Sequence, residues 1–420
     1  MNLSSTTTST PDALPQGLPT TSASSRAERH LLAMLARLTH GTLDLQGPDG
    51  HVRQFRGSRQ PDAVRAAITV HDAKVYAQLL KSGDIGLAEA FFEGAWTSPD
   101  IPALLRLGLL NRQALEAAIF GSRLGSWLYR IVHLLRRNTK AGSRRNIHAH
   151  YDLGNRFYRL WLDGSMNYSS AWFDGNRSQP LRAAQDAKMA RALAEAQVKP
   201  GSRVLEIGCG WGAVAEAAAR QGAHLTGLTL STEQLEFAQN RLADAGLSQQ
   251  VDIRLQDYRD VAATMVEPYD AIVSIEMFEA VGREYWASYF KTVKQCLASG
   301  GRACIQTITI ADELFERYVR STDFIQQYVF PGGLLPSPSI FRAEAQKAGL
   351  VVERELCFGT DYAHTLRLWR QAFLEQLPQV KAQGFDTRFV RLWEFYLAYC
   401  EAAFDAGSTD VMQFTLRHDA

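Results

Sequence analysis

The stretch Arg203-Val-Leu-Glu-Ile-Gly-Cys-Gly-Trp-Gly212 constrains the fold of this chain more than any other. A β-prone run stops at three glycines, and a helical pattern follows from Ala213 to Arg220. Glycine lets the backbone approach a ligand where a Cβ atom would block it. The start of a helix offers free N–H groups to a carboxylate. Together these features predict an open α/β sheet with a ligand site at its strand ends.

The residues around the glycines narrow the choice of ligand. Glu206 stands two residues before Gly208, and no Lys-Ser or Lys-Thr pair follows the glycines, so the stretch is not a phosphate-binding P-loop. A carboxylate at this place suits a ligand amine. With Gly210, the stretch resembles the first motif of the S-adenosylmethionine (SAM) methyltransferases, which favours SAM over a dinucleotide. The alternative is a tight turn in an ordinary α/β domain.

Strand and helix patterns alternate after this motif. We expect strands at 203–207, 224–229, 251–255, 270–275, 302–309 and 351–358, and helices at 213–221, 231–244, 284–298 and 340–348. The alternation predicts a doubly wound α/β sheet with parallel strands at its centre. Apolar residues at helical spacing over 364–406 predict a helical extension.

The chain before the sheet divides into three parts. Residues 1–25 are rich in Ser, Thr and Pro, and they predict a disordered tail and no signal peptide. Residues 26–120 predict a small α+β domain, with helices that include 74–80, 85–92 and 101–118. Residues 121–150 form a basic, aromatic-bearing amphipathic linker that is typical of a segment on an anionic membrane. An ordinary interdomain helix with a solvated basic face explains this linker equally well.

The catalytic domain is expected over 151–420, with an apolar insertion at 310–340 that could cover a long ligand or be core. The net charge of +1 argues against a nucleic-acid binder. Five cysteines without a Cys-x-x-Cys pair suggest reduced thiols in a cytoplasmic protein. No apolar run is long enough to span a bilayer.

Polar residues at the next strand ends predict further cofactor contacts. Thr229 ends the second strand and Gln234 follows one helical turn later, so a hydroxyl and an amide could hold the ribose hydroxyls. Thr229 could instead be a helix cap, although Ser231 is better placed for that role. Asp257 and Tyr258 end the third strand, where they could bind the adenine amine and stack on its ring.

Two carboxylates follow the fourth strand. Glu276 and Glu279 are three residues apart and would share one face of a helical turn beside the ligand crevice. Their neighbours Ile275, Met277 and Phe278 are apolar, and a solvent-exposed carboxylate without a functional role is not expected beside apolar residues. A functional role for the pair is therefore favoured over a purely structural one.

Several motifs spread over the chain carry a more specific signal: His150-Tyr-Asp-Leu-Gly-Asn, Met166-Asn-Tyr-Ser, Leu205-Glu-Ile-Gly-Cys-Gly-Trp-Gly, Gly227-Leu-Thr-Leu-Ser, Asp257-Tyr-Arg-Asp, Met277-Phe-Glu-Ala-Val-Gly, Tyr328-Val-Phe-Pro-Gly-Gly-Leu-Leu-Pro-Ser and Asp361-Tyr-Ala-His-Thr-Leu. Together they resemble the cyclopropane-fatty-acyl-phospholipid synthase family, which includes the mycolic-acid methyltransferases. A weaker match of the first domain agrees with the lipid-binding N-terminal domain of the longer members.

The resemblance implies a cation mechanism. A cis alkene in an acyl chain attacks the SAM methyl group, and a base then removes a proton from the added methyl to close a ring. The family's base is a bicarbonate ion held by a cysteine, a glutamate, a histidine, a tyrosine and backbone groups. Matched by motif, the glutamate is Glu279 and the tyrosine is Tyr362. Tyr168 and Ser169 match family positions near the SAM carboxylate.

The chain departs from the family at the bicarbonate site. Ser170 replaces the cysteine, Gln306 replaces the histidine, and Ala280 replaces the histidine of a Phe-Glu-His turn. Glu276 stands where the ring-forming enzymes have glycine. Similar substitutions look like those of the branch related to tuberculostearic acid methyltransferases, which make mid-chain methyl or methylene branches.

We therefore expect SAM-dependent C-methylation of a cis double bond in the acyl chains of membrane phospholipids, giving a cyclopropane or a branch. Glu276 or Glu279 could be the base or could shield the cation, and bicarbonate could still bind. Such an enzyme would be cytoplasmic and peripheral on the inner, anionic membrane face, with a homodimer as one option. Two alternatives stay open: a methyltransferase of a small soluble acceptor, and a SAM- or lipid-binding protein that has lost catalysis.

Overall fold

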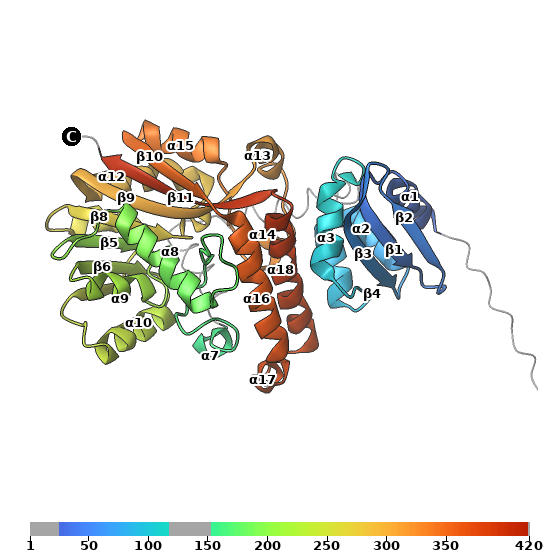
Figure 1. Ribbon diagram of the computed structural model, residues 1–420, viewed down its shortest axis with the longest axis horizontal. Coiled ribbons are helices and arrows are strands. Elements are labelled where there is room, and N and C mark those ends of the chain that lie inside the picture. Colours follow the sequence, from blue (N-terminus) through green and yellow to red (C-terminus); the bar gives the residue numbers. More distant parts are fainter. Residues whose placement is uncertain (1–24, 117–152, 419–420) are drawn as a thin grey trace, which may run out of the picture.

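A computed structural model describes residues 25–116 and 153–418 of the chain (Figure 1). The expected tail at its N-terminus and the basic amphipathic linker at 121–150 lie outside the described residues, as does the start of the His150 motif. Among the helices that the structure describes, none has the length and apolar character needed to cross a membrane.

A seven-stranded sheet forms the larger part of the molecule, in the order β10-β11-β9-β8-β5-β6-β7. Neighbouring strands from β7 to β9 pair in parallel, whereas β11 runs antiparallel between β9 and β10. The predicted doubly wound sheet with a parallel centre is confirmed. The strands are β5 (Arg203–Ile207), β6 (His224–Thr229), β7 (Val251–Leu255), β8 (Tyr269–Ile275), β9 (Leu297–Ile310), β10 (Leu350–Cys357) and β11 (Thr409–His418).

Helices cover both faces of this sheet because its strands are apolar on both sides. On β5, Val204 faces the layer of α8 (Leu181–Glu195), α9 (Ala213–Arg220) and α10 (Thr232–Asp244). Its neighbour Leu205 faces the opposite layer of α12 (Trp286–Cys296) and α15 (Pro338–Lys347). This alternation follows from the two-residue period of a strand.

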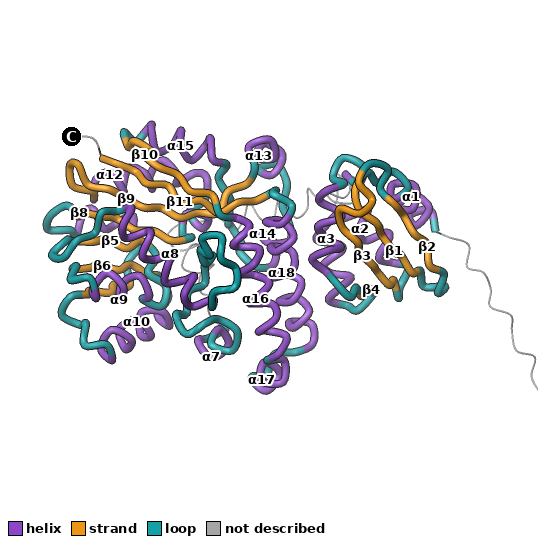
Figure 2. Tube along the Cα trace, viewed as in Figure 1, coloured by secondary structure: helices purple, strands orange, loops and turns teal. Residues whose placement is uncertain are grey.

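The insertion after β9 and the segment after β10 are helical. The insertion holds α13 (Asp312–Tyr318) and α14 (Phe324–Tyr328). After β10 come α16 (Gly359–Glu375), α17 (Leu377–Ala382) and α18 (Thr387–Asp405), and α16 and α18 lie side by side (Figure 2). The predicted helical extension is present, but the chain then returns to the sheet as β11, which the sequence patterns do not reveal.

The N-terminal region is a four-stranded sheet, in the order β2-β1-β3-β4, packed with helices. Its elements are α1 (Arg26–Leu35), β1 (His40–Gln46), β2 (Val52–Arg56), β3 (Gln60–Val70), α2 (Lys74–Phe92), β4 (Trp96–Thr97) and α3 (Ile101–Leu110). The helices predicted at 74–80 and 85–92 join as α2, which is kinked at Gly83 with φ of 62°. The helix predicted to reach residue 118 ends at Leu110.

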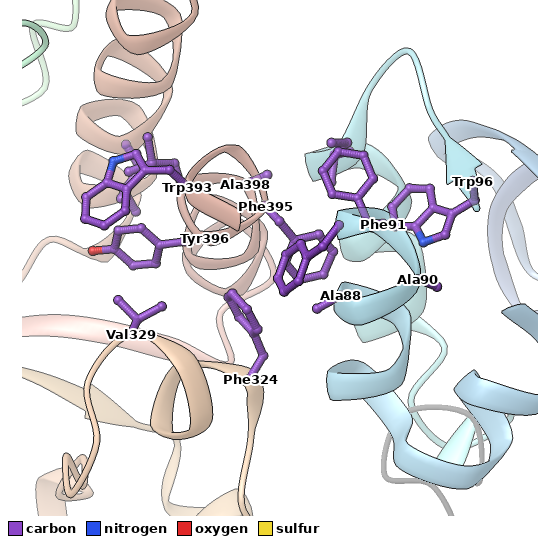
Figure 3. Packing of buried hydrophobic residues seen from close by; sticks show 14 of the residues in the cluster. Ala88, Ala90, Phe91, Trp96, Phe324, Val329, Trp393, Phe395, Tyr396 and Ala398 are labelled. Carbon is purple, nitrogen blue, oxygen red and sulfur yellow. The ribbon is translucent and has the colours of Figure 1, made fainter. Parts of the chain in front are cut away.

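This N-terminal region packs against α14 and α18 through aromatic side chains (Figure 3). The ring of Phe324 on α14 lies 6.0 Å from that of Phe92 on α2 and 5.0 Å from that of Phe395 on α18, between centroids. Asp84 of α2 accepts hydrogen bonds from Phe324 N at 3.1 Å and from Tyr399 Oη at 2.7 Å. One apolar core therefore continues from the first sheet into the second part of the molecule.

Candidate active site

The glycine turn lies where β5 ends and α9 begins. Gly208, Gly210 and Gly212 all have positive φ, at 86°, 51° and 82°. A Cβ atom on Gly208 would come within 2.8 Å of Met277 Cγ, whereas one on Gly210 would point into open space. The turn therefore brings backbone close to the segment just after β8 and leaves room beside Gly210 for a ligand.

Glu206 is a buried carboxylate at the end of β5. Its Oε2 atom has no hydrogen-bond partner among the described residues. Burial raises its pKa to about 8, and the charges of Lys188 and Arg241 act in the opposite direction. Buried polar atoms in proteins normally have partners, so this oxygen suits a donor from a ligand, such as an amine.

The ends of β6 and β7 carry the other predicted cofactor residues. Thr229 Oγ1 donates to Gln234 Oε1 at 3.0 Å and accepts from Ser231 N at 3.1 Å. Gln234 can therefore offer a ligand its amide nitrogen. Ser231, and not Thr229, caps α10, since its hydroxyl accepts from Gln234 N.

Asp257 and Tyr258 follow β7, next to the end of β6. Both carboxylate oxygens of Asp257 accept from the Arg259 guanidinium, with the Oδ2–Nη2 pair at 2.6 Å. Arg259 also lies 5.7 Å from the ring centroid of Tyr258, which is buried. The sequence does not reveal this ion pair, which fixes Asp257 before any ligand binds.

Glu276 is the centre of the polar network at the end of β8. Its Oε1 atom accepts from Ser170 N at 2.8 Å and from Gln306 Nε2 at 2.7 Å, and its Oε2 atom accepts from Tyr362 Oη at 2.6 Å. Its φ of 49° lies in the left-handed region that favours glycine. Such strained residues persist where the surroundings hold them, and they cluster at functional sites.

The partners of Glu276 are themselves fixed in orientation. Gln306 Oε1 accepts from Gln413 Nε2 of β11 at 3.0 Å, so the amide nitrogen of Gln306 must face Glu276. The ring of Tyr362 stacks on Phe404 with centroids 4.5 Å apart. Ser170 contributes its backbone N–H, because its hydroxyl donates to Ala171 O at 2.9 Å. Burial raises the pKa of Glu276, and these three donors oppose that rise.

Glu279 has a poorer set of donors than Glu276. Its Oε1 atom accepts from Ile308 N, and its buried Oε2 atom has no partner among the described residues. Burial, followed by the charge of Glu276, raises its pKa to about 8. The hydrogen bonds therefore favour the proton on Glu279 and the negative charge on Glu276.

The remaining predicted residues line the same region from the segment before α8. Tyr168 Oη lies 2.7 Å from Tyr396 Oη. Ser169 Oγ accepts from Lys188 Nζ at 2.6 Å, and the Lys188 side chain is fully buried. Lys188, Gln413 and Ile308 are contacts that the sequence does not reveal.

Comparison with known proteins shows the family to which this chain belongs. Residues 138–414 match the family model of mycolic acid cyclopropane synthetase. The chain belongs to this family. It is 38% identical to tuberculostearic acid methyltransferase UfaA1 of Mycobacterium tuberculosis over 96% of this chain and 93% of the relative. It is 34% identical to the cyclopropane-fatty-acyl-phospholipid synthase of Escherichia coli over 83% of this chain and 87% of the relative.

A solved structure agrees with this assignment. The mycolic acid cyclopropane synthase CmaA1, complexed with SAH and CTAB, is 33% identical to this chain with a TM-score of 0.60. The match covers 65% of this chain and 98% of the CmaA1 chain. This member of the cyclopropane synthetase family is a SAM-dependent methyltransferase, as the motifs predict.

Because the chain belongs to this family, we can ask where the structure places the polar residues that match the family's motifs. Four residues that the resemblance singles out, Ser170, Glu276, Gln306 and Tyr362, meet in one hydrogen-bonded cluster. Glu279 lies beside this cluster and bonds a separate backbone group. The glycine turn and the strand-end residues of β5 to β7 lie along the neighbouring strand ends, where α/β folds bind nucleotide-like ligands.

Proposed function

We propose that this cyclopropane synthetase family member methylates the cis double bond of an unsaturated fatty acyl chain in a membrane phospholipid. One observation carries the proposal in its detailed form. Ser170 and Gln306, at the positions of two bicarbonate ligands in the resembling family, and Tyr362, at the position of a third, all bind the carboxylate of Glu276. The chain's own carboxylate therefore occupies the place expected for the bicarbonate ion.

The reaction needs a base only after methyl transfer. The π electrons of the alkene form a bond to the SAM methyl carbon, the methyl–sulfur bond breaks, and a cation remains on the neighbouring carbon. Loss of a proton from the new methyl group, with bond formation to the cationic carbon, closes a cyclopropane. A hydride shift toward the cationic carbon before the same proton loss gives a methylene branch. In both routes Glu276 accepts the proton.

Glu276 suits this role better than Glu279 for an electrostatic reason. A base must be ionised when the cation forms, and hydrogen bonds to a carboxylate favour its ionised form. Both oxygens of Glu276 accept such bonds, three in all, whereas Oε2 of Glu279 has no partner among the described residues. A fixed negative charge beside the cation also stabilises the charge that develops there. Glu279 would serve as a neutral neighbour in this scheme.

An apolar cavity supports a long acyl substrate. It has a volume of about 530 Å³ and lies between the N-terminal region, α13 and α18. Its walls are mostly aliphatic and include Leu43, Leu107 and Leu335. Leu334, which precedes Leu335 of the wall, donates its N–H to the main-chain oxygen of Glu279 at 2.9 Å. We propose that an acyl chain of the substrate lies in this cavity.

The membrane side of the proposal rests on the sequence. Between residues 117 and 151 there is no acidic residue, and seven are Arg or Lys. A basic amphipathic stretch of this kind binds anionic lipid surfaces. We therefore propose a cytoplasmic enzyme that works peripherally on an anionic membrane face, where its substrate chains are.

Mass spectrometry of the lipid product tests the proposed function. Purified protein is incubated with SAM and vesicles of cis-monounsaturated anionic phospholipid. We expect a gain of one CH₂ per modified chain, and ozonolysis then separates a ring from a methylene branch. No gain on any vesicle, with methyl transfer to a soluble acceptor, would contradict the proposal.

The role of Glu276 is tested in the same assay. General bases contribute about 10²–10⁴-fold to rates, so Glu276→Gln should lower turnover by at least about 100-fold while binding of S-adenosylhomocysteine (SAH) is kept. Glu279→Gln is the matched control, and it should keep turnover within about tenfold because Glu279 is already protonated near neutral pH. The opposite ranking of the two variants would assign the base to Glu279.

A further inference from the structure

Lys188 of α8 is a buried ammonium whose position calls for an anion. Its side chain has no exposed surface, and its Nζ atom makes one hydrogen bond among the described residues, to Ser169 Oγ at 2.6 Å. An ammonium carries three donors, and burying one without a counter-charge is costly. No carboxylate lies within ion-pair distance of Nζ in the described part of the chain, although Glu276, Asp163 and Glu206 are near enough to act on its charge.

Helix α8 fixes Ser169 from two sides. Gln185 Nε2 donates to Ser169 O at 2.8 Å, and Lys188 donates to its hydroxyl oxygen. Because that oxygen already accepts from the ammonium, the hydroxyl proton of Ser169 points to another acceptor. The segment that carries Ser169 lines the crevice, since the next residue, Ser170, donates its N–H to Glu276.

Two incompletely bonded buried groups, one acidic and one basic, thus lie near enough to each other to interact electrostatically. Glu206 has an oxygen without a partner, and Lys188 has donors without one, among the described residues. The amino-acid end of SAM is a zwitterion with an ammonium and a carboxylate. Glu206 suits the ammonium, and the Ser169 hydroxyl backed by the Lys188 charge suits the carboxylate.

We propose that Lys188 is the positioning residue for the cofactor's carboxylate: it turns the Ser169 hydroxyl into a donor toward that group and supplies the positive charge behind it. The inference rests on the SAM site at the glycine turn. It does not require Lys188 to touch the substrate or the reacting methyl group.

Binding of two cofactor fragments separates this role from a merely structural one. SAH has the amino-acid end, and 5′-methylthioadenosine lacks it. In calorimetry with the full chain, Lys188→Met should weaken SAH about 10- to 100-fold and leave methylthioadenosine within twofold of wild type. Equal losses for both ligands, or none for either, would overturn the proposal. If wild type does not bind methylthioadenosine at all, the cofactor crevice itself is misassigned, which is a separate failure.

Two further variants keep the test valid if Lys188→Met folds poorly. Lys188→Gln keeps a donor for Ser169 without the charge, so its SAH affinity should fall between those of wild type and Lys188→Met. Ser169→Ala should weaken SAH in the wild-type background and much less in the Lys188→Met background, because the two groups act as a unit. Additive losses would contradict the proposed relay. Unchanged SAH affinity with a shifted pH profile of turnover would show that Lys188 serves Glu276 instead.

Discussion

The number of donors around each carboxylate decides what Glu276 and Glu279 can do. Both are buried in the same region, and burial raises both pKa values. The three hydrogen bonds to Glu276 come from a backbone N–H, an amide and a phenol, and each favours the negative charge. Residues of the same type, three positions apart, thus differ in how well their surroundings support a negative charge.

Removing one donor should shift the pH dependence of turnover. The Tyr362 hydroxyl favours the ionised form of Glu276, so Tyr362→Phe raises the pKa of that carboxyl further. Glu276 acts as a base only when ionised, so the acid limb of kcat/KM should move to higher pH. A hydrogen bond to a charged group contributes about 1.5–3 kcal/mol, and we expect a loss of about tenfold or more at neutral pH.

The matched control is Tyr396→Phe. The Tyr396 hydroxyl is also buried, but it bonds Tyr168 and not Glu276. Its removal should leave the position of the acid limb unchanged. A limb that stays in place in Tyr362→Phe, or that moves equally in both variants, would refute the assigned function of the phenol bond.

At the scale of elements, the glycine turn has two separable functions. Gly208 permits close packing of the turn on Met277, just after β8, whereas a Cβ atom on Gly210 would enter open space. Gly208→Ala, with φ of 86° and a contact of 2.8 Å to Met277, should lower the melting temperature through strain of about 1–3 kcal/mol. Gly210→Ala should leave stability closer to wild type and weaken SAH binding. Thermal unfolding and calorimetry on both variants test this assignment. A larger loss of stability in Gly210→Ala, together with a larger loss of SAH affinity in Gly208→Ala, would contradict it.

The elements also show what the sequence could predict. The strands β5 to β10 have β-prone runs next to glycine turns or helical patterns, so all six are predicted. Their predicted ends agree with the structure within a residue or so, except that β9 begins at Leu297 and not at residue 302. Several elements are not predicted, and α8 and β11 matter most for the site. Helix α8 buries the polar residues Gln185 and Lys188 together with its apolar ones, so its apolar stripe is weak. Strand β11 follows three helices in the chain but pairs far away, with β9 and β10.

These two missed elements explain two of the site contacts that the sequence did not reveal. Lys188 lies on α8, and Gln413 lies on β11, so neither could be connected with Glu276 or Ser169 from spacing alone. Only the family resemblance could predict that Ser170, Gln306 and Tyr362 lie together, because they come from distant parts of the chain. Hydrogen-bond direction, which separates Glu276 from Glu279, required the side-chain geometry.

At the scale of the whole molecule, the N-terminal region is connected through α14 to the segment that bonds the backbone of Glu279. Asp84 accepts from the first N–H of α14, and Glu89 accepts from the Tyr328 hydroxyl at its end. The chain continues from α14 to Leu334, which bonds Glu279 O. The apolar cavity lies between these connected parts, so its filling should affect the lipid reaction and not the cofactor site.

Gly108 offers a clean way to fill this cavity. It lies on α3 in the cavity wall, and a Cβ atom there would meet nothing within 4 Å. Gly108→Leu should slow methylation of phospholipid vesicles at least several-fold, with SAH affinity unchanged and stability equal or higher, since leucine favours a helix more than glycine does. Gly108→Ala is the control for the helix effect. Unchanged turnover on vesicles would place the acyl chain elsewhere.

The most direct test of the internal carboxylate is the dependence of turnover on bicarbonate. The wild-type enzyme should methylate phospholipid equally fast in buffer freed of carbon dioxide and in buffer with added bicarbonate. Glu276→Gly should lose turnover without bicarbonate and regain it when bicarbonate is added, since glycine suits the φ of 49° and opens the space between Ser170, Gln306 and Tyr362. A wild-type enzyme that stops on depletion and recovers with bicarbonate would contradict the account.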